Sequence, residues 1–544
     1  MLKKLPLLTL TIISLFLIFS CANKKGSVEG GPKDIVPPKI VKEVPENYTT
    51  NFNGNEIRIY FNEYIKIKDL QKQLIVSPPM DMQPEVSPLG SANKYIKIII
   101  NDTLEDNTTY AFNFGQSIVD NNEQNPFSYY KYVFSTGDYI DSLSIKGQVF
   151  SADTRQVDKF ISVMLYEVDS TYTDSLVYKQ SPRYITNTLD STTTFSLENL
   201  KAGRYKLLAL KDKNNNFRFE QKADKIGYYE GVVNIPSDSF YSVTLFKEKL
   251  DDRILNPKQI AGQKISFGFE GDPEDVEIKI LSDIPDDYEY RITKDKKTDT
   301  LYYWYKPKIA LDSTYFEVKK GVFIDTLKHR FKEMNRDSLK ITASTSGSID
   351  FDKDLILEAT TPLTMIDESK IRVLGKDSLE VPFKVEFDSL RNTVKVKLDK
   401  KESEDYKFQM LPETFKDFFG DTNDTLNYTI RTKSLSDFSN VRAIVTNATY
   451  PIIVQLTNAK DEVKYELIAD ENRPLDFRNI ATGTYYMRVI IDETGNGKWD
   501  SGNYLKGLQP ERIIYDTKPI EARANFDYVH DFEVPQKRPD RLKN

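Results

Sequence analysis

Residues 55–63 read NEIRIYFNE, and this stretch decides the fold of the first part of the chain. Its apolar residues Ile57, Ile59 and Phe61 alternate with polar or half-polar neighbours. Alternation with a period of two predicts a β-strand that buries one face. The same alternation returns in later runs at residues 95–100, 110–114 and 132–134. Short alternating strands separated by turn residues predict an antiparallel β-sandwich over residues 37–138.

Three segments of this sandwich carry a resemblance to a known family. Residues 37–41 (PPKIV), 55–63 and 107–110 (NTTY) resemble bacterial Ig-like domains of the surface-layer type. The resemblance implies an Ig-like fold and an exported protein. It implies no particular chemistry.

A second sandwich is predicted over residues 141–250. Its strands begin at residues 145–149 (IKGQV) and continue at 162–166 (SVMLY). Residues 195–205 (FSLENLKAGRY) then enter a glycine turn and return through an aromatic residue. This run resembles transthyretin-like or carboxypeptidase-regulatory β-sandwiches. The resemblance implies a non-catalytic spacer or binding module.

A third sandwich, again Ig-like, is predicted over residues 262–334. Residues 302–305 read YYWY and form an aromatic strand within it. The four rings either fill the core and cover the strand surface, or form a carbohydrate-stacking platform, which needs rings side by side on one exposed face. The sequence leaves both interpretations open.

The remaining chain repeats the first two sandwiches. Residues 340–433 repeat 37–138, with DLILEA at 354–359 in the place of EIRIYF. Residues 438–532 repeat 141–250, with NIATGTY at 479–485 in the place of NLKAGRY at 199–205. Internal duplication is typical of domain arrays. The sequence therefore predicts an all-β tandem array of about five antiparallel sandwiches, followed by a polar tail at 535–544.

The N-terminus predicts export and lipidation. A basic head (MLKK) precedes an apolar run at residues 5–19, and Cys21, the only cysteine, follows. This order is typical of a secretory signal peptide, here residues 1–20. The cysteine after the cut resembles the lipobox of bacterial lipoproteins, which implies that Cys21 becomes the acylated N-terminus. A plain cleaved signal with a chance cysteine and an uncleaved anchor helix stay open. Residues 21–36 are rich in glycine and charge and predict a flexible tether.

Composition excludes several classes of function. The net charge is −7 over 544 residues, and no basic stripe with interleaved aromatics suggests a nucleic-acid partner. One cysteine and two histidines exclude disulfides, a Cys/His zinc site and a thiol nucleophile. Neither His329 nor His530 has a nucleophile-elbow motif beside it. We therefore predict that the chain is not an enzyme.

Two polar loops resemble calcium-binding loops in their spacing. Oxygen-bearing side chains at positions 1, 3, 5 and 9 can surround a hard cation. The candidate ligands are Asp492, Thr494, Asn496 and Asp500 in one loop, and Asp212, Asn214, Asn216 and Glu220 in the other. Position 12, which is a bidentate Glu in such loops, is Asn503 or Ala223, and Phe217 stands where Gly is preferred. The alternative is a long hairpin closed by Asx turns, with no cofactor.

The whole chain resembles an Ig-like-domain lipoprotein of Bacteroidota, through Cys21, the run GGPKD at 30–34 and the Ig-like domain that follows. The resemblance implies anchoring in the outer membrane by acylated Cys21, with the body facing the cell surface; a periplasmic orientation stays open. We predict a non-catalytic interaction subunit with an outer-membrane protein partner, accessory to a complex for outer-membrane protein assembly or transport. The alternative is a glycan-binding lipoprotein of the cell surface.

Overall fold

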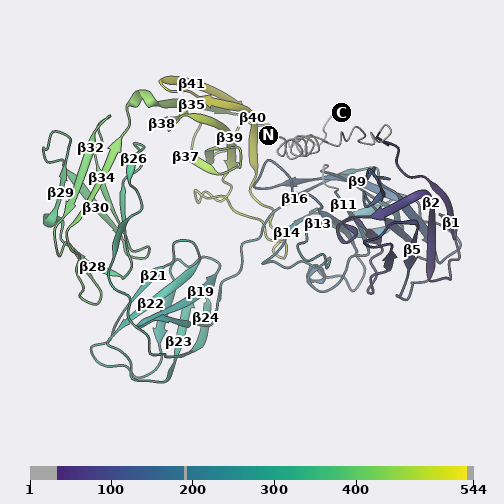
Figure 1. The fold of residues 1–544 in the computed structure, drawn as a ribbon, viewed down its shortest axis with the longest axis horizontal. Helices are drawn as coiled ribbons and strands as arrows, with labels where there is room; N and C mark the ends of the chain where they lie inside the picture. Colours follow the sequence, from purple (N-terminus) through teal and green to yellow (C-terminus); the bar gives the residue numbers. More distant parts are fainter. Residues whose placement is uncertain (1–32, 189–192, 536–544) are drawn as a thin grey trace, which may run out of the picture. The chain divides into compact units, whose positions relative to one another are not determined.

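The computed structural model describes residues 33–188 and 193–535, and nearly all of its regular structure is strand (Figure 1). The described residues form two compact units. One comprises residues 33–142 with 199–201, and the other comprises residues 143–188, 193–198 and 202–535. We name five modules by their strands: A1 (β1–β8), B1 (β9–β16), C (β17–β24), A2 (β25–β34) and B2 (β35–β41). No helix in the described ranges is long and apolar enough to cross a membrane.

Module A1 packs one sheet of order β1-β2-β5-β4 beside a second of order β3-β6-β8. Its longest strand, β2, pairs with β5 at residues 56–60 and again at Ile65, and with β7 at residues 65–67. A short helix, α2 (Leu70–Gln73), follows β2. The strands are β1 (Ile40–Val44), β2 (Glu56–Ile67), β3 (Ile75–Ser77), β4 (Glu85–Ser87), β5 (Asn93–Ile99), β6 (Thr109–Asn113), β7 (Ile118–Asp120) and β8 (Lys131–Ser135).

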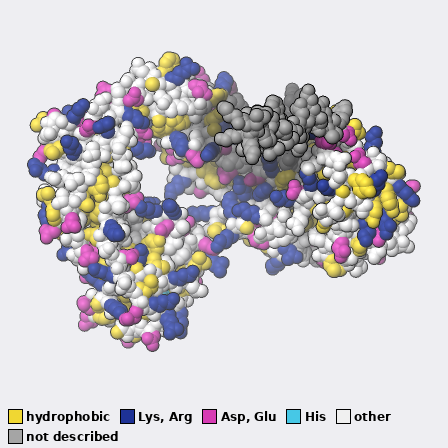
Figure 2. Space-filling view, in the orientation of Figure 1, with side chains coloured by type: hydrophobic (Ala, Val, Ile, Leu, Met, Phe, Trp, Pro, Cys, Tyr) yellow, Lys and Arg dark blue, Asp and Glu magenta, His cyan; other side chains and the backbone are white. Residues whose placement is uncertain are grey.

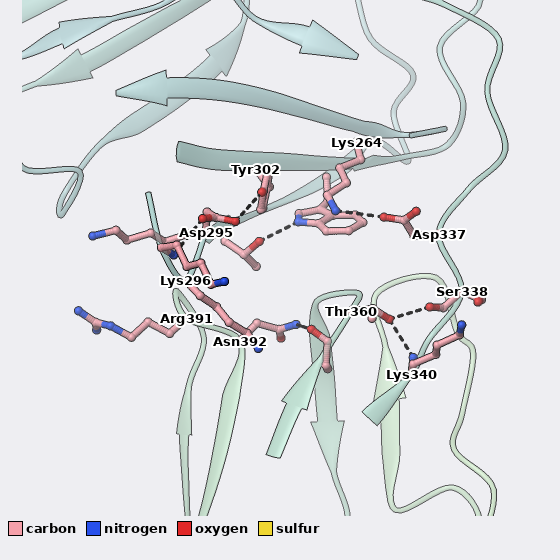
Figure 3. Close-up of a pocket in the computed structure, with 15 residues that line it drawn as sticks. Lys264, Asp295, Lys296, Tyr302, Asp337, Ser338, Lys340, Thr360, Arg391 and Asn392 are labelled. Atoms are coloured by element: carbon pink, nitrogen blue, oxygen red, sulfur yellow. Dashed lines mark hydrogen bonds and ion pairs between the residues drawn. The ribbon is translucent and has the colours of Figure 1, made fainter. Parts of the chain in front are cut away.

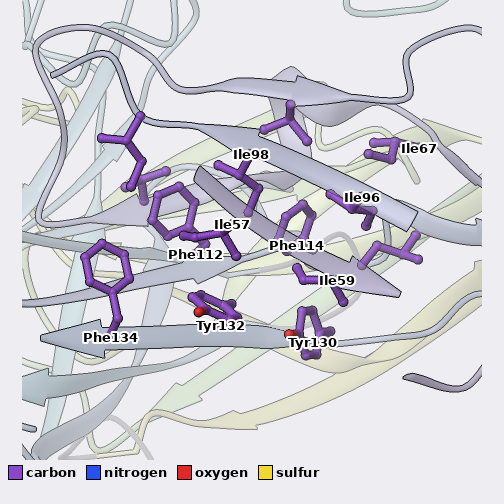
Figure 4. Close-up of a cluster of buried hydrophobic side chains, with 14 of the residues drawn as sticks. Ile57, Ile59, Ile67, Ile96, Ile98, Phe112, Phe114, Tyr130, Tyr132 and Phe134 are labelled. Atoms are coloured by element: carbon purple, nitrogen blue, oxygen red, sulfur yellow. The ribbon is translucent and has the colours of Figure 1, made fainter. Parts of the chain in front are cut away.

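The core of A1 comes from the alternation that the sequence shows. Ile57 and Ile59 of β2 point inward with Ile96 and Ile98 of β5, against aromatic rings that include Phe112 (Figure 4). Because the side chains of a strand alternate between its two faces, Arg58 and Tyr60 lie on the outer face. The apolar positions of residues 55–63 therefore form the centre of this core.

Module B1 joins its first and last strands side by side. β9 and β16 pair in parallel in a sheet of order β12-β9-β16, and the second sheet has the order β11-β10-β13-β14 with β15 on β13. A Cβ on Gly147 of β9 would lie 2.1 Å from the carbonyl oxygen of Tyr241, so this close approach requires glycine. The strands are β9 (Leu143–Ser151), β10 (Ser162–Glu167), β11 (Tyr184–Asn187), β12 (Thr194–Leu200), β13 (Gly203–Lys211), β14 (Lys225–Tyr228), β15 (Val233–Ile235) and β16 (Phe240–Leu245).

Module C pairs a sheet of order β17-β19-β22-β21, with β18 on β19, with a sheet of order β20-β23-β24. Inward residues of both sheets, among them Phe267, Tyr303 and Phe316, form one core. The strands are β17 (Arg253–Ile254), β18 (Lys258–Ala261), β19 (Lys264–Glu270), β20 (Glu277–Ile280), β21 (Glu289–Lys294), β22 (Thr300–Lys306), β23 (Ser313–Lys320) and β24 (Phe323–Arg330).

Module A2 has sheets of order β25-β27-β31-β30 and β26-β34-β32-β29, and the pair β28-β33. Module B2 has sheets of order β38-β35-β41 and β37-β36-β39-β40. The A2 strands are β25 (Ile341–Ala343), β26 (Gly347–Ile349), β27 (Leu355–Ala359), β28 (Leu363–Ile366), β29 (Ile371–Leu374), β30 (Phe383–Asp388), β31 (Thr393–Leu398), β32 (Asp405–Met410), β33 (Phe415–Asp417) and β34 (Leu426–Thr432). The B2 strands are β35 (Phe438–Thr446), β36 (Ile452–Thr457), β37 (Val463–Ala469), β38 (Leu475–Ala481), β39 (Gly483–Ile491), β40 (Ile513–Ala522) and β41 (Phe526–Glu533).

The repeated modules share their topology. The sheet β11-β10-β13-β14 of B1 corresponds to β37-β36-β39-β40 of B2, and the parallel pair β9/β16 corresponds to β35/β41. Asn199 and Asn479 both adopt left-handed backbone angles before the equivalent hairpin. The predicted all-β array and its repetition are confirmed, while the predicted limits of each domain stay predictions.

Figure 2 shows Lys and Arg side chains interspersed with Asp and Glu over the face in view, with small apolar patches between them. Mixed charge of this kind is typical of a solvated protein surface.

Candidate functional site

The predicted lipidation site, Cys21, lies outside the described residues, as do the signal peptide at 1–20 and most of the tether at 21–36. Acylation of Cys21 therefore stays a prediction from the sequence. Every other predicted site residue lies within the described ranges.

The polar loop of B1 is closed by its own hydrogen bonds. The carboxylate of Asp212 accepts from the backbone amides of Asn214 at 2.9 Å and of Phe217 at 2.7 Å. The side-chain amides of Asn214 and Asn216 donate to Glu220, each at 2.8 Å. The spacing thus brings all four predicted ligands together, with amide donors directed at the Glu220 carboxylate.

The polar loop of B2 has the same construction. Asp492 accepts from the backbone amides of Asn496 at 3.2 Å and Gly497 at 2.8 Å. The Thr494 hydroxyl and the Asn496 side-chain amide both donate to Asp500, at 2.8 Å. In the part of the chain that the structure describes, no group of three or more His, Cys, Asp or Glu side chains is placed to hold a metal ion.

Each loop also rests on a second, buried carboxylate that the sequence analysis did not identify. Asp224 accepts from the amides of Lys213 and Glu220, both at 2.9 Å, in B1. Glu511 takes this place in B2, where it accepts from the amides of Thr494 at 3.2 Å and Asp500 at 2.9 Å. Burial raises the pKa of Glu511 above its ordinary value. These carboxylates show that the two loops are structurally equivalent.

The two loops differ by an insertion. Asp224 follows Glu220 closely, whereas residues 501–510 separate Asp500 from Glu511. The insertion of B2 contacts B1. The Tyr504 side chain, 2% exposed, lies edge-on to the Tyr228 ring with the ring centres 5.2 Å apart. Its hydroxyl lies 3.1 Å from the hydroxyl of Tyr172.

The backbone of the insertion is fixed to B1 as well. The Tyr504 amide donates to Glu248 at 2.6 Å, and the Ser501 hydroxyl donates to the carbonyl of Lys247. The side-chain amide of Gln509 donates to the carbonyl of Tyr228 at 3.1 Å. A Cβ on Gly502 would lie 2.7 Å from the Phe246 ring, so the backbone approaches B1 as closely as only glycine allows.

A second set of contacts joins the modules through Arg155, in the loop after β9. Its Nε lies 2.7 Å from Asp461, in the turn after β36, and its backbone amide donates to the same carboxylate at 3.1 Å. The guanidinium lies 3.8 Å from the centre of the Tyr486 ring. The Arg155–Asp461 contact is a charge-assisted hydrogen bond, which is stronger than one between neutral groups.

Arg488 of β39 adds a buried contact to the same set. It donates to Gln455 at 2.6 Å, to the Tyr515 hydroxyl at 3.0 Å and to the backbone carbonyl of Asp153 at 3.1 Å. We call the contacts of residues 501–509, Arg155 and Arg488 the B1–B2 interface. The duplicated modules therefore bind each other within one chain.

The aromatic strand β22 serves mainly as core. Tyr303, Trp304 and Tyr305 are buried, and Tyr303 packs against Phe267 and Phe316. Tyr302 is half-buried, and together with Trp304 it lines a pocket between strands of C and loops of A2 (Figure 3). The four residues do not form a row of exposed rings.

Comparison with known proteins identifies one part of the chain. Among solved structures, domains 1–6 of the surface layer protein SbsC share 10% identity, cover 89% of this chain and 67% of theirs, and give a TM-score of 0.17. The Bacillus anthracis TIE protein shares 11% identity over 94% of this chain and 76% of its own, with a TM-score of 0.15. Overlaps this weak establish neither a shared arrangement nor a shared function. No curated protein matches the sequence. Residues 34–136 match the bacterial Ig-like domain family, which covers module A1.

Proposed function

We propose that the chain is a lipid-anchored outer-membrane protein that acts as a non-catalytic interaction subunit. Its partner is an outer-membrane protein, within a complex that assembles or transports such proteins. The Ig-like domain at 34–136 supports a structural or interaction role. The sequence around Cys21 supports the anchor, since more than one acyl chain on that cysteine holds a protein stably on a bilayer.

The observation that carries the proposal is the B1–B2 interface. Because B1 and B2 bind each other, the chain between them, which comprises modules C and A2, is tied at both ends. Tying both ends restricts how those modules move. A surface that is ordered before binding loses less conformational entropy when a partner docks. The interface therefore favours a role in presenting surfaces to a partner.

The test is recovery of the full chain from membranes in mild detergent, through a C-terminal affinity tag. We expect a membrane β-barrel protein to co-purify in a fixed ratio. The Cys21→Ser variant should leave the membrane fraction, and a chain with both Arg155→Ala and Tyr504→Ala should recover less of the partner. Recovery of the unaltered chain as a monomer with no co-purifying membrane protein would contradict the proposal.

Glycan binding is the second candidate function, and one observation favours it. The pocket beside Tyr302 has a volume of about 500 Å³, within the range of small-ligand sites. The test is calorimetric titration of the full chain with acidic and neutral oligosaccharides. Saturable binding of any of these oligosaccharides would support glycan binding. The absence of a heat change with every one of them would exclude it.

A further inference from the structure

The chain enters modules A1 and A2 through the same contacts. In A2, the backbone amide of Lys340 donates to the Thr360 hydroxyl at 2.8 Å, and the Thr360 amide donates to the carbonyl of Lys340 at 3.1 Å. In A1, the amide of Lys39 donates to the Asn62 side chain at 2.6 Å, and the Asn62 amide donates to the carbonyl of Lys39 at 3.0 Å. The chain therefore enters the two repeated modules at equivalent positions.

A second contact holds the entering chain in each module. In A1, the loop after β7 holds it, since the Asn125 side chain donates to the carbonyl of Asp34 at 2.9 Å. In A2, the loop after β33 holds it, since Asp421 pairs with Arg336 at 2.8 Å. We call this part of each module its entry end. The entry end of A1 comprises residues 33–39, 62–68, 88–94 and 121–125.

Module C covers the entry end of A2. Leu390, in the turn between β30 and β31, packs against the core of C, and the backbone amide of Lys294 donates to its carbonyl at 2.7 Å. Phe419 packs edge-on to Trp304 of C, with ring centres 6.3 Å apart. Figure 3 shows this end of A2, with Thr360, below the strands of C. The entry end of A2 is therefore covered by the module from which the chain comes.

The tether precedes the entry end of A1, and this end exposes apolar side chains. Leu89 lies in the turn between β4 and β5, which corresponds to the turn of Leu390, and it is 62% exposed. Tyr64 is 56% exposed, and Ile35 and Val36 of the entering segment are 77% and 51% exposed. A group of exposed apolar side chains is typical of a surface that contacts a protein or a membrane.

Backbone and side-chain contacts join Leu89 to the entering segment. Leu89 forms a β-bridge with Ile67 of β2. The side chain of the next residue, Lys68, donates to the side chain of Gln124. Gln124 lies in the loop that holds Asp34 and therefore the segment with Ile35 and Val36. The exposed apolar residues thus belong to one end of the module.

Tyr64 belongs to the same end and has the chemistry of an interfacial residue. Its carbonyl accepts from the backbone amide of Asn121, in the same loop, at 2.9 Å. The ammonium group of Lys94 lies 5.4 Å from the centre of the Tyr64 ring. Tyrosine and lysine suit a membrane–water boundary, because each combines an apolar body with a polar tip.

The sequence before the entry end of A1 limits what can cover this end. Cys21 lies twelve positions before Lys33, the first described residue. A fully extended chain spans about 3.5 Å per residue, so an acylated Cys21 keeps Lys33 within about 40 Å of the bilayer. Because the entering segment is bonded to the entry end, this end of A1 lies nearest to the anchor along the chain.

We propose that the entry end of A1 rests on the bilayer surface, with Ile35, Val36, Tyr64 and Leu89 in the headgroup layer. The bilayer then covers this end of A1 as module C covers that of A2. The inference rests on the proposed lipid anchor and adds a second attachment to it. A few apolar side chains alone bind a membrane weakly, but the anchor keeps them at a high local concentration beside it.

The experiment uses the acylated full chain with one added cysteine, since Cys21 is the only natural cysteine and its thiol is acylated in the proposed form. The chain is reconstituted into vesicles of phosphatidylethanolamine and phosphatidylglycerol that contain a lipid with a nitroxide on its headgroup. A bimane label at Leu89→Cys is compared with one at Met82→Cys. Met82 is a matched control, since it is 52% exposed and its amide donates to Asp102, beyond the far end of β5.

We expect the nitroxide to quench the label at Leu89→Cys about threefold more than the label at Met82→Cys, because interfacial side chains lie within the headgroup layer. Ile35→Asp with Val36→Asp should reduce the quenching at Leu89→Cys to the control level. The variant should stay in the membrane fraction, because Cys21 still anchors it.

Three results would overturn the inference and leave the proposed anchor standing. They are equal quenching of the two labels in the anchored chain, unchanged quenching at Leu89→Cys after Ile35→Asp with Val36→Asp, and a disulfide between two Leu89→Cys chains. The disulfide would assign the entry end to a second copy. Recovery of the unaltered chain outside the membrane fraction would instead overturn the anchor and the inference together.

Discussion

His329 is a buried histidine in the core of module C, 2% exposed. Its Nε2 lies 3.0 Å from Gln259 Oε1, and its ring packs against Phe316 and Phe331. Burial lowers the pKa of His329 to about 4, from an ordinary value of 6.5. The folded protein therefore favours the neutral form of His329. The side chain serves in packing rather than in catalysis.

The stability of module C should therefore fall in acid. Between pH 6.5 and 4, His329 binds a proton in the unfolded chain but not in the folded one. Its contribution to the free energy of unfolding is therefore fully present above pH 6.5 and is lost as the pH falls towards 4. At pH 5 we expect a loss of about 2 kcal/mol. Hydrogen exchange of the β23 and β24 amides at pH 7 and 5 measures it. His329→Gln should remove most of this pH dependence, and an equal dependence in that variant would contradict the assignment.

Tyr504 places a buried aromatic ring in the B1–B2 interface. Tyr504→Ala removes a buried ring and leaves a cavity, which costs about 3 kcal/mol for a large aromatic side chain. We expect faster hydrogen exchange in residues 501–510 and at Tyr228. The matched control is Tyr315→Ala, since Tyr315 is 49% exposed. Equal protection in the Tyr504 variant and the control would show that the insertion does not depend on this contact.

The polar loops after β13 and β39 are hairpin connections closed by carboxylates. Asp212 and Asp492 accept backbone amides, as the Asx-turn alternative predicts. Asn216 and Asn496 direct side-chain N–H groups at the acidic residue where a cation would need oxygen ligands. Calcium binding would require these two side-chain amides to flip, so that their oxygen atoms face the cation.

We therefore expect calcium to leave both loops unchanged. Thermal unfolding of the full chain in 5 mM calcium or in chelator should give the same midpoints, for the unaltered chain and for Asp492→Asn. Asp492→Asn should itself lower the midpoint modestly, because one buried charged acceptor is lost. A calcium-dependent increase that disappears in Asp492→Asn would contradict this and establish the loop as a calcium site.

The strands and the repeats could be predicted from the sequence, because both produce local patterns of residue type. The alternation at Ile57, Ile59 and Phe61 gives the buried face of β2 directly. The aligned runs at 199–205 and 479–485 give the equivalent hairpins. Local periodicity does not depend on which other strands complete the core, so one sequence suffices.

The B1–B2 interface and the pocket could not be predicted in the same way. Residues 501–510 carry no periodicity, and their partners at Tyr172, Tyr228 and Glu248 lie more than 250 positions earlier. The pocket likewise combines β19 and β22 with loops of A2. One signal was present in the sequence: the spacing between the loop carboxylates differs between the repeats, which marks the insertion.

In the second unit, the interface predicts that B1 and B2 are bound to each other in solution. The single cysteine makes this directly measurable, since Cys21→Ser leaves a chain without other thiols. Two exposed positions accept spin labels as cysteines, Lys146 on β9 and Val529 on β41. Neither position lies in the B1–B2 interface.

The most direct measurement is the electron–electron distance distribution between labels at Lys146→Cys and Val529→Cys in the full chain. Because the interface fixes B1 against B2, we predict one narrow distance. Adding Arg155→Ala and Tyr504→Ala should broaden it and shift it to longer values. A broad distribution in the chain with an intact interface, or the same narrow one after both substitutions, would contradict the claim that this interface ties the two modules together.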